Sequence, residues 1–321
     1  MLRDEKLDIV ATVIPVKPNP EIVIASARAG VRGIVTEKPI AGRLVDLDRM
    51  VEACAEAGIP FQAGNVDRVR PQNWAARQAI IDGAIGEVHS ISCFTQIVQG
   101  GCNALAWAKM FALGQFIRGQ SGKDADVEWV IGKTVGDPFS DSDEGLNGIG
   151  GCIHFANGID MTVHERASSR RGVEVVGTTG MFASDGHRLR FWQRTDEDGD
   201  DVFCGMKEVF GLAPDVPREE TVVSSDGWLE PDGRIVDTVQ SIVDALDNGT
   251  EPRCSGRDQQ QAFEITLALR ESARRGHAPV RLPLPPEIRE QPMGPVPYRW
   301  NSKRDLYVTE WYMNEMQRHK K

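Results

Sequence analysis

Residues 33–42 read GIVTEKPIAG, and this stretch decides the fold of the first part of the chain. The apolar run at residues 33–35 has the length of a short buried strand. Glu37, Lys38 and Pro39 follow directly, and a helical pattern begins a few residues later. Because Pro39 favours an extended backbone at Lys38, the helix cannot begin before the proline. The stretch therefore predicts a strand that ends in a lysine.

The sequence around this stretch alternates between strand and helix patterns. Strands are predicted at residues 8–14, 33–36 and 59–64, and helices at about 20–30, 44–57 and 72–82. In the second of these helices, apolar residues recur at intervals of three and four, which indicates one face packed on a sheet. They are Leu47, Met50, Val51, Cys54 and Ala57. Short apolar strands joined by helices predict a parallel, doubly wound sheet.

From residue 87 the pattern changes to short strands separated by glycine turns. A strand pattern at 87–98 is followed by an apolar segment at about 102–117, which is compatible with a helix. The dipeptide Asn157-Gly158 is a strong hairpin signal. Helices are predicted at about 235–248 and 258–275. This part of the chain therefore predicts a mostly antiparallel, open sheet with helices on one face, an α+β arrangement.

We predict three segments from these patterns: a Rossmann-like parallel-sheet domain at 1–86, an α+β domain at 87–285, and a tail at 286–321. The tail is rich in aromatic side chains, which often pack on the body of a protein or on a second subunit. They are Tyr298, Trp300, Tyr307, Trp311 and Tyr312.

Composition excludes several classes of function. The formal net charge of the 321 residues is −10, which argues against nucleic acid and anionic membranes as partners. The six cysteines form no CxxC pair, so they predict neither a zinc site nor a disulfide framework, and they favour the cytoplasm. We find no apolar stretch of about 20 residues, and the charged start MLRDEK is unlike a signal peptide.

The predicted position of Lys38 has chemical consequences. In an open α/β sheet, ligands bind beyond the carboxyl ends of the strands, which is where Glu37, Lys38 and Pro39 are expected. A lysine at that edge can donate a hydrogen bond to a substrate oxygen or carry a proton. The alternative is an exposed lysine beside a glutamate, with no function beyond solubility.

The order of these motifs resembles the glucose-fructose oxidoreductase, inositol dehydrogenase and rhizopine-catabolism (Gfo/Idh/MocA) family. The resemblance covers residues 4 to about 90 and, more loosely, the hairpin region. The matching residues are Asp8-Ile9-Val10, Glu37-Lys38-Pro39, Gly64, Arg68, Pro71 and the run GAIGEV at 83–88.

This resemblance implies an enzyme that binds NAD or NADP on the first domain and transfers a hydride at a sugar or cyclitol hydroxyl or carbonyl. The family's lysine in this motif lies between cofactor and substrate, so Lys38 is the candidate catalytic residue and also a cofactor and substrate contact. The other implied cofactor contacts are Pro15, Glu37, Pro39 and Asn65, and Arg68 is an implied substrate contact.

The sequence departs from the family at its start. Family members begin with a strand, a GxGxxG turn and a helix that hold the cofactor pyrophosphate through backbone N–H groups. This sequence begins after such a unit, so a βαβαβ half of roughly 60 residues is expected to be missing. NAD or NADP binding is therefore expected only if that half is supplied.

A second departure concerns the family's Asp-x-Gly-x-His motif, which is followed by an aspartate and an arginine. Alignment on Gly101 places Gln99, Asn103, Ala106 and Lys109 at the four functional positions. Asn103 can hydrogen-bond a sugar hydroxyl, so it is a candidate catalytic and substrate-binding residue. It cannot titrate near neutral pH and therefore has no acid–base capacity. Lys38 is then the matched residue that keeps this capacity.

A metal site is not predicted. His154 and His164 flank the Asn-Gly turn and could face each other across the hairpin, but we find no third ligand near them in sequence. Metal sites need three or four ligands, so paired residues of a sheet are the better interpretation.

Three hypotheses remain open at this point. The chain is a sugar or cyclitol oxidoreductase whose upstream coding segment supplies the GxGxxG unit, or it is a non-catalytic relative that binds carbohydrate or forms oligomers. In the third, a partner chain completes the sheet, because an open strand edge near Leu7 invites pairing. The open sheet of the second domain, as in the family, predicts a homo-oligomer.

Overall fold

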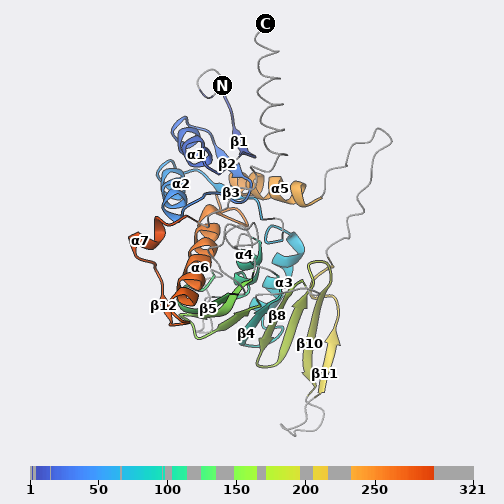
Figure 1. Ribbon diagram of the computed structural model, residues 1–321. Coiled ribbons are helices and arrows are strands. Elements are labelled where there is room, and N and C mark those ends of the chain that lie inside the picture. Colours follow the sequence, from blue (N-terminus) through green and yellow to red (C-terminus); the bar gives the residue numbers. More distant parts are fainter. Residues whose placement is uncertain are drawn as a thin grey trace, which may run out of the picture.

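The computed structural model describes two sheets that are stacked one above the other and joined by helices (Figure 1). The described residues are 2, 5–14, 16–65, 67–95, 97, 103–113, 124–134, 148–164, 171–195, 205–215 and 233–292. Pro15, Gln99 and Gly101, and the part of the predicted tail beyond residue 292, lie outside this set.

The first sheet has three parallel strands in the order β1-β2-β3. The strands are β1 (Ile9–Thr12), β2 (Gly33–Thr36) and β3 (Phe61–Ala63). Its connecting helices are α1 (Asn19–Arg28) and α2 (Leu44–Glu56), and α3 (Pro71–Ile81) follows β3. Figure 1 shows α1 and α2 on one side of this sheet. The predicted parallel sheet is therefore confirmed for these strands.

Helix α2 shows why this layer forms. Leu47, Met50 and Cys54 are buried as the spacing predicts, and Leu44 is buried with them, whereas Val51 is half-buried and Ala57, just past the helix, is exposed. The helix ends at Glu56, and Gly58, two residues later, has a φ of +65°, a conformation that glycine adopts without steric cost. The chain can then turn directly into β3.

The second sheet has nine strands in the order β11-β10-β9-β8-β4-β7-β6-β5-β12. All neighbours are antiparallel except β4 and β7, which run parallel. The strands are β4 (Val88–Cys93), β5 (Val127–Thr134), β6 (Ile149–Phe155), β7 (Asp160–Val163), β8 (Val173–Gly177), β9 (Gly180–Ser184), β10 (Leu189–Thr195), β11 (Gly205–Val209) and β12 (Val280–Arg281). The predicted mostly antiparallel sheet is confirmed.

The hairpin predicted from Asn157-Gly158 joins β6 and β7. Gly158 has a φ of +85°, and the Nδ2 group of Asn157 donates to the carbonyl of Leu113 at 2.6 Å. The turn is thus fixed both by its own backbone and by the segment that follows the short helix α4 (Ala104–Lys109).

Helix α6 (Gly256–Arg274) joins the two sheets. It lies so close to β5 that a Cβ atom added at Gly132 would stand 1.8 Å from the carbonyl oxygen of Leu269. At its other end, the preceding loop pairs with β3, because the N–H of Ala63 donates to the carbonyl of Cys254 at 2.7 Å. Helix α7 (Pro286–Arg289) then adds an ion pair between Arg289 and Asp48 of α2 at 2.6 Å.

The position of helix α5 (Gly233–Asn248) does not follow from the predicted segment boundaries. It falls within the predicted segment 87–285, yet it packs on the parallel sheet. A Cβ atom at Gly33 of β2 would lie 3.4 Å from Ile242, and the buried Ser241 hydroxyl donates to Gln62 of β3 at 2.8 Å. The boundaries 1–86, 87–285 and 286–321 stay a prediction. Helix α5, which is remote in sequence, covers part of the parallel sheet β1-β2-β3. In the part of the chain that the structure describes, no helix combines the length and apolar character of a membrane span.

Candidate active site

Lys38 lies at the carboxyl end of β2, as predicted. The backbone N–H of Glu37 donates to the carbonyl of Thr12 at 2.9 Å, so the turn sits beside the end of β1. The Lys38 side chain is 24% exposed, and its ammonium lies 3.4 Å from the Glu37 carboxylate. An ammonium has three N–H donors. Among the described residues Glu37 is its only partner, so further donors stay available to a ligand.

The next strand end lies against this turn. The N–H of Gly64 donates to the carbonyl of Thr36 at 2.8 Å, and a Cβ atom at Gly64 would stand 2.6 Å from Oε2 of Glu37. Asn65 is fully buried, and its Oδ1 accepts from the N–H groups of Asp67 at 3.1 Å and Arg68 at 3.0 Å. That oxygen shapes the loop after β3, while the predicted cofactor contact of Asn65 stays a prediction.

Arg68, the predicted substrate contact, is held in a buried ion network. One guanidinium nitrogen lies 2.9 Å from Asp124 and 2.7 Å from the Ala106 carbonyl oxygen, and another lies 2.8 Å from Asp258. Its side chain is only 4% exposed. A direct contact with substrate would require some of these bonds to break. The arrangement favours a structural role in which Arg68 ties the loop after β3 to α4 and α6.

Two further cations share Asp124. Arg77 of α3 lies 3.0 Å from one carboxylate oxygen, and Lys109 of α4 lies 3.4 Å from the other. Burial acts against the charge of Asp124, but Arg68, Lys109 and Arg77 outweigh it and hold its pKa well below the usual range.

The three cations respond differently to this shared carboxylate. Burial acts against the charge of Arg68 too, but Asp124 and Asp258 outweigh it and raise its pKa. Burial prevails for Arg77 and Lys109, whose pKa values are lowered. The contrast follows from the ion pairs, because Arg68 lies against both Asp124 and Asp258, whereas Arg77 and Lys109 share the Asp124 carboxylate with it. Both arginines stay charged, since guanidinium does not lose its proton in proteins.

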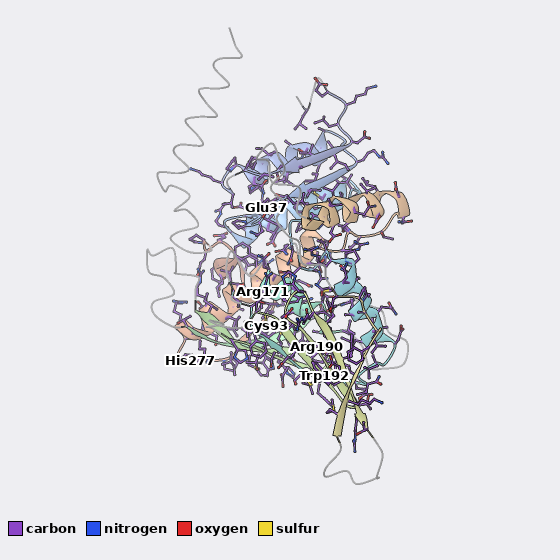
Figure 2. All side chains as sticks on the ribbon, turned by 90° about the vertical axis from the view of Figure 1, so that its right-hand side faces the viewer. Glu37, Cys93, Arg171, Arg190, Trp192 and His277 are labelled. Atoms are coloured by element: carbon purple, nitrogen blue, oxygen red, sulfur yellow. The ribbon has the colours of Figure 1, made fainter. Side chains whose placement is uncertain are left out.

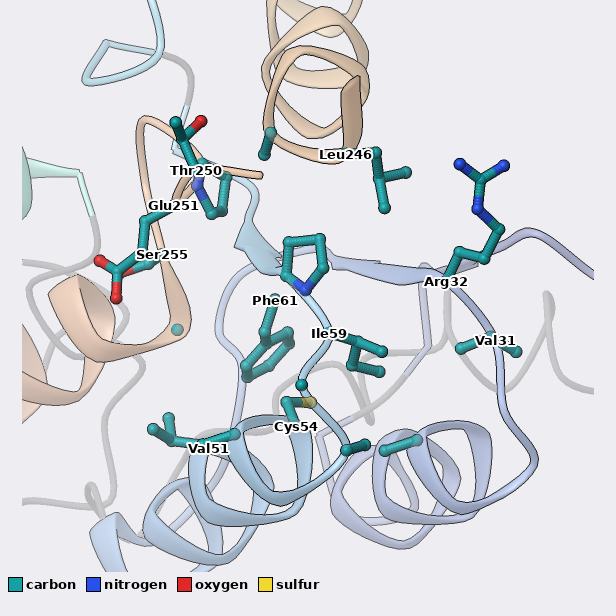
Figure 3. A pocket seen from close by; sticks show the side chains of 18 of the residues that line it. Val31, Arg32, Val51, Cys54, Ile59, Phe61, Leu246, Thr250, Glu251 and Ser255 are labelled. Atoms are coloured by element: carbon teal, nitrogen blue, oxygen red, sulfur yellow. The ribbon is translucent and has the colours of Figure 1, made fainter. Parts of the chain in front are cut away.

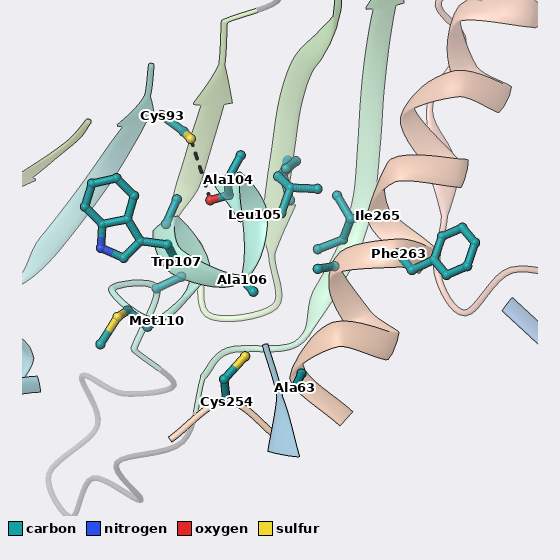
Figure 4. Close-up of a cluster of buried hydrophobic side chains, with 14 of the residues drawn as sticks. Ala63, Cys93, Ala104, Leu105, Ala106, Trp107, Met110, Cys254, Phe263 and Ile265 are labelled. Carbon is teal, nitrogen blue, oxygen red and sulfur yellow. Dashed lines mark hydrogen bonds between the residues drawn. The ribbon is translucent and has the colours of Figure 1, made fainter. Parts of the chain in front are cut away.

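Asn103 directly precedes α4, and its side chain makes no capping hydrogen bond with that helix. Its Oδ1 is buried and has no hydrogen-bond partner among the described residues. Ala106 is buried within the helix, and Lys109 belongs to the ion network. The start of α4 is anchored to the large sheet, because the Cys93 thiol lies 3.8 Å from the carbonyl oxygen of Ala104 (Figure 4).

The loop after β3 also contacts the large sheet directly. Asp67, which is 8% exposed, forms an ion pair with Arg171, whose side chain is 47% exposed. The next residue, Gly172, donates its N–H to Thr95 just after β4 at 3.3 Å. Figure 2 shows Arg171 between Glu37, at the parallel sheet, and Cys93, at the end of β4. The carboxyl ends of β1 to β3 therefore face the carboxyl end of β4.

The suggestion that His154 and His164 face each other is wrong. The register of β6 and β7 places His154 opposite Asp160, and its Nδ1 lies 2.7 Å from that carboxylate. His154 stacks on Trp129, with 4.8 Å between ring centroids. His164 lies beyond the ladder and stacks on Phe94 at 4.6 Å. Within the described ranges, no cluster of three or more His, Cys, Asp or Glu side chains is suited to a metal ion.

A cavity of about 730 Å³ lies at the opposite edge of the parallel sheet (Figure 3). Val31 and Ile59, which precede β2 and β3, line it together with Cys54, Phe61 and Leu246. Ligands in open α/β sheets bind at the carboxyl edge, whereas this cavity is at the amino edge. We therefore place the candidate site at Lys38 and not in this cavity.

Sequence reasoning missed one residue of this site, Asn19. It is the first residue of α1, yet its side chain is 1% exposed and reaches the turn that carries Lys38. An Asn-Pro pair at a helix start normally indicates a local cap or turn, so the sequence offered no signal for a contact with residues 36–40.

The strand ends of a Rossmann-like parallel sheet thus lie next to an open, mostly antiparallel sheet. Residues 1–65 match the model of the Gfo/Idh/MocA family, described as an oxidoreductase family with an NAD-binding Rossmann fold. Over most of its length the chain is similar to oxidoreductases, and its first 65 residues match the NAD-binding part of that family.

Two relatives cover most of the chain. D-apiose dehydrogenase of Paraburkholderia graminis is 26% identical over 295 residues, which are 86% of this chain and 73% of that protein. Myo-inositol 2-dehydrogenase of Thermotoga maritima is 23% identical over 288 residues, covering 85% of this chain and 79% of the relative. Among solved structures, levoglucosan dehydrogenase in complex with NADH and levoglucosan superimposes with a TM-score of 0.64 at 18% identity, covering 88% of this chain and 82% of the other. At that identity the likeness establishes the fold alone.

Proposed function

We propose that this chain is an NAD(P)-dependent oxidoreductase that transfers a hydride to or from a carbon of a sugar or cyclitol. The observation that carries the proposal is Lys38, which ends β2 in a domain that matches an NAD-binding Rossmann family. The two relatives named above are dehydrogenases of a sugar and of a cyclitol. Both support a polyhydroxylated substrate.

The strand ends suit the nicotinamide portion of the cofactor. Val13 and Ile14 follow β1 directly and are 79% and 37% exposed, so apolar surface is open at the edge where Lys38 lies. A flat, largely apolar ring packs well on such a surface. Glu37 and Pro39 are the proposed neighbours of the ring, and Asn65 and Pro15 complete the proposed contacts. When bound, the nicotinamide accepts or supplies the hydride at the substrate carbon.

Lys38 is the proposed acid–base residue. As a sugar alcohol is oxidised, its hydroxyl proton leaves while the hydride departs from the same carbon, and Nζ of Lys38 is the proposed acceptor of that proton. In the reverse direction the ammonium donates the proton to the carbonyl oxygen. The nearby Glu37 carboxylate, 3.4 Å away, holds the ammonium at the strand edge between transfers.

Asn103 and Arg68 have separate proposed roles. The buried Oδ1 of Asn103 has no partner among the described residues, so it is suited to accept a hydrogen bond from a substrate hydroxyl. Arg68 is proposed to act on the substrate through the position of α4, because its guanidinium already binds the carbonyl of Ala106.

Calorimetry with NADH and NADPH, followed by an absorbance assay over aldoses and cyclitols, tests the proposal. Because backbone N–H groups of a GxGxxG unit hold the pyrophosphate, we expect micromolar binding of at least one dinucleotide, and turnover of at least one sugar, when that half is supplied. Lys38→Met should lower turnover by about 10²–10⁴-fold, the usual contribution of a general acid or base. Lys17→Met, a change at an exposed lysine of the same domain, should leave it unchanged. Failure of both dinucleotides to bind would instead favour a non-catalytic relative that binds carbohydrate.

The large sheet supports a proposed homo-oligomer. The register places Val176, Met181 and Trp192 in one row across β8, β9 and β10. This row lies on the face opposite Phe182 and Phe191, which belong to the core, and Val176 is 42% exposed. We propose that a second copy covers this row. Analytical ultracentrifugation should give at least a dimer, and Val176→Arg should shift it toward the monomer; a monomeric parent protein would exclude the idea.

We also propose that the protein functions in the cytoplasm. Four of its cysteines, Cys54, Cys93, Cys152 and Cys254, are free thiols in the described ranges. Free thiols are typical of a reducing compartment. Fractionation of cells that express the chain, with thiol counting on the recovered protein, tests this placement.

A further inference from the structure

The turn that carries Lys38 is tied at both ends to one buried side chain. Nδ2 of Asn19 donates to the Thr36 hydroxyl at 2.8 Å and to the Ile40 carbonyl at 2.8 Å. Thr36 directly precedes Glu37, and Ile40 directly follows Pro39. The two hydrogens of a single amide group therefore clamp the segment Glu37-Lys38-Pro39 from beneath.

The clamp is fully enclosed. Asn19 is 1% exposed, Thr36 is 0% and Ile40 is 2%. The Thr12 hydroxyl also donates to the Thr36 hydroxyl at 2.7 Å, which links the end of β1 to the same point. Hydrogen bonds that are shielded from water fix geometry more firmly than exposed ones, because water cannot replace the lost partner.

The chemistry of the clamp depends on an amide. Its Oδ1 has no hydrogen-bond partner among the described residues, so the side chain contributes at this position through its two N–H donors. An aspartate has the same shape but offers no donors, and a serine offers one. Neither can hold the Thr36 hydroxyl and the Ile40 carbonyl together.

The Lys38 side chain itself has little else to hold it. It is 24% exposed, and its ion pair is with the adjacent Glu37, so the direction in which its ammonium points follows from the backbone of the turn. We propose that Asn19 is the positioning residue for Lys38, setting the orientation of the amine at the strand edge. Its value for catalysis rests on the proposed function, whereas the geometric claim does not.

The test measures how fast the Lys38 amine reacts with trace acetic anhydride, relative to exposed Lys17, by peptide mass spectrometry. Partly buried Lys38 should label more slowly than Lys17 in the parent protein. Asn19→Ala removes both bonds and should raise the relative rate by at least about fivefold, the change that corresponds to loss of one typical hydrogen bond. Thr12→Val is the matched control, because it removes a bond to Thr36 and leaves both bonds of Asn19. It should lower the melting temperature without changing the Lys38 rate.

An unchanged Lys38 rate in folded Asn19→Ala would overturn the proposal, as would an equal increase in Thr12→Val. If Asn19→Ala does not fold, Asn19→Ser replaces it, since one hydroxyl cannot serve both acceptors; an unchanged rate in that variant also overturns the proposal. Labelling needs neither cofactor nor substrate. A parent protein without activity would therefore count against the proposed function alone, and the labelling result would still decide the role of Asn19.

Discussion

Arg68 and Asp124 form an ion pair at 2.9 Å in which the two side chains are 4% and 8% exposed. The pair joins the loop after β3 to the segment that precedes β5. Asp124 also lies 3.0 Å from Arg77. One buried carboxylate therefore links the loop after β3, helix α3 and the segment before β5.

Asp124→Asn should destabilise the protein by about 3–5 kcal/mol, because it leaves buried cations without their counter-charge. Urea unfolding of both proteins measures the difference. Asp8→Asn is the matched control, since Asp8 pairs with Arg32 but the two side chains are 74% and 62% exposed. An exposed pair contributes about 0.2–1 kcal/mol at most. Equal losses in the two variants would show that the Asp124 network is not the stronger contact.

The same carboxylate gives a pH dependence. The cations hold the folded-state pKa of Asp124 below that of the unfolded chain, about 3.9. Its contribution is therefore complete above that unfolded value and is lost as the pH falls toward the folded value. Urea midpoints at pH 6, 5, 4 and 3 should show the parent losing its advantage over Asp124→Asn below about pH 4. If the difference in urea midpoint between the two proteins stayed constant down to pH 3, the loss of stability in acid would come from groups other than Asp124.

Lys109 should behave differently from Asp124. Burial lowers the pKa of Lys109, so its charge is unfavourable in the folded protein, and Asp124 retains two arginines without it. Lys109→Met keeps the buried volume and should change stability by about 1 kcal/mol or less, in either direction, as for replaced buried charges. Lys109→Ala should cost about 2–4 kcal/mol more, because it opens a cavity. A large loss in the methionine variant would mean that the charge itself holds α4.

The fold was predictable where local patterns determine it. The periodic apolar positions of α2 and the Asn157-Gly158 turn carry their structural meaning within a few residues. The packing of α5 on β2 was not predictable, because its amphipathic pattern indicates a buried face but not which sheet buries it. Contacts between Ile242 and Gly33 depend on chain topology over about two hundred residues, which no local period encodes.

The site residues likewise include some that local sequence places and others that only remote contacts place. Lys38 was placed correctly because a strand followed by proline fixes its backbone locally. The buried network of Arg68 was not foreseen, since its partners Asp124 and Asp258 are remote in sequence and come together only through α6. The same holds for Asn19, whose acceptors lie on the next strand and beyond it.

Alanine substitutions at Gly64 and Gly132 should differ in their cost, because Gly64 lies at the candidate site and Gly132 lies against helix α6. A Cβ atom at Gly64 would stand 2.6 Å from Oε2 of Glu37, the mobile end of a side chain, and 3.2 Å from the carbonyl oxygen of Thr36. Gly64→Ala should therefore fold with a loss of about 1 kcal/mol, of the order of a displaced side chain. The Glu37 carboxylate should move away from Lys38, so the Lys38 labelling rate should rise.

Gly132→Ala is the contrasting change. Its Cβ atom would stand 1.8 Å from the backbone oxygen of Leu269 in α6, and neither backbone can yield without moving the helix off β5. The loss should exceed that of Gly64→Ala by at least about 2 kcal/mol, as for overpacking against a rigid partner. Thermal unfolding of the two variants checks the order. If Gly64→Ala proved the less stable protein, the strand end at Lys38 would be a rigid part of the core, and the Glu37 side chain could not be the element that yields.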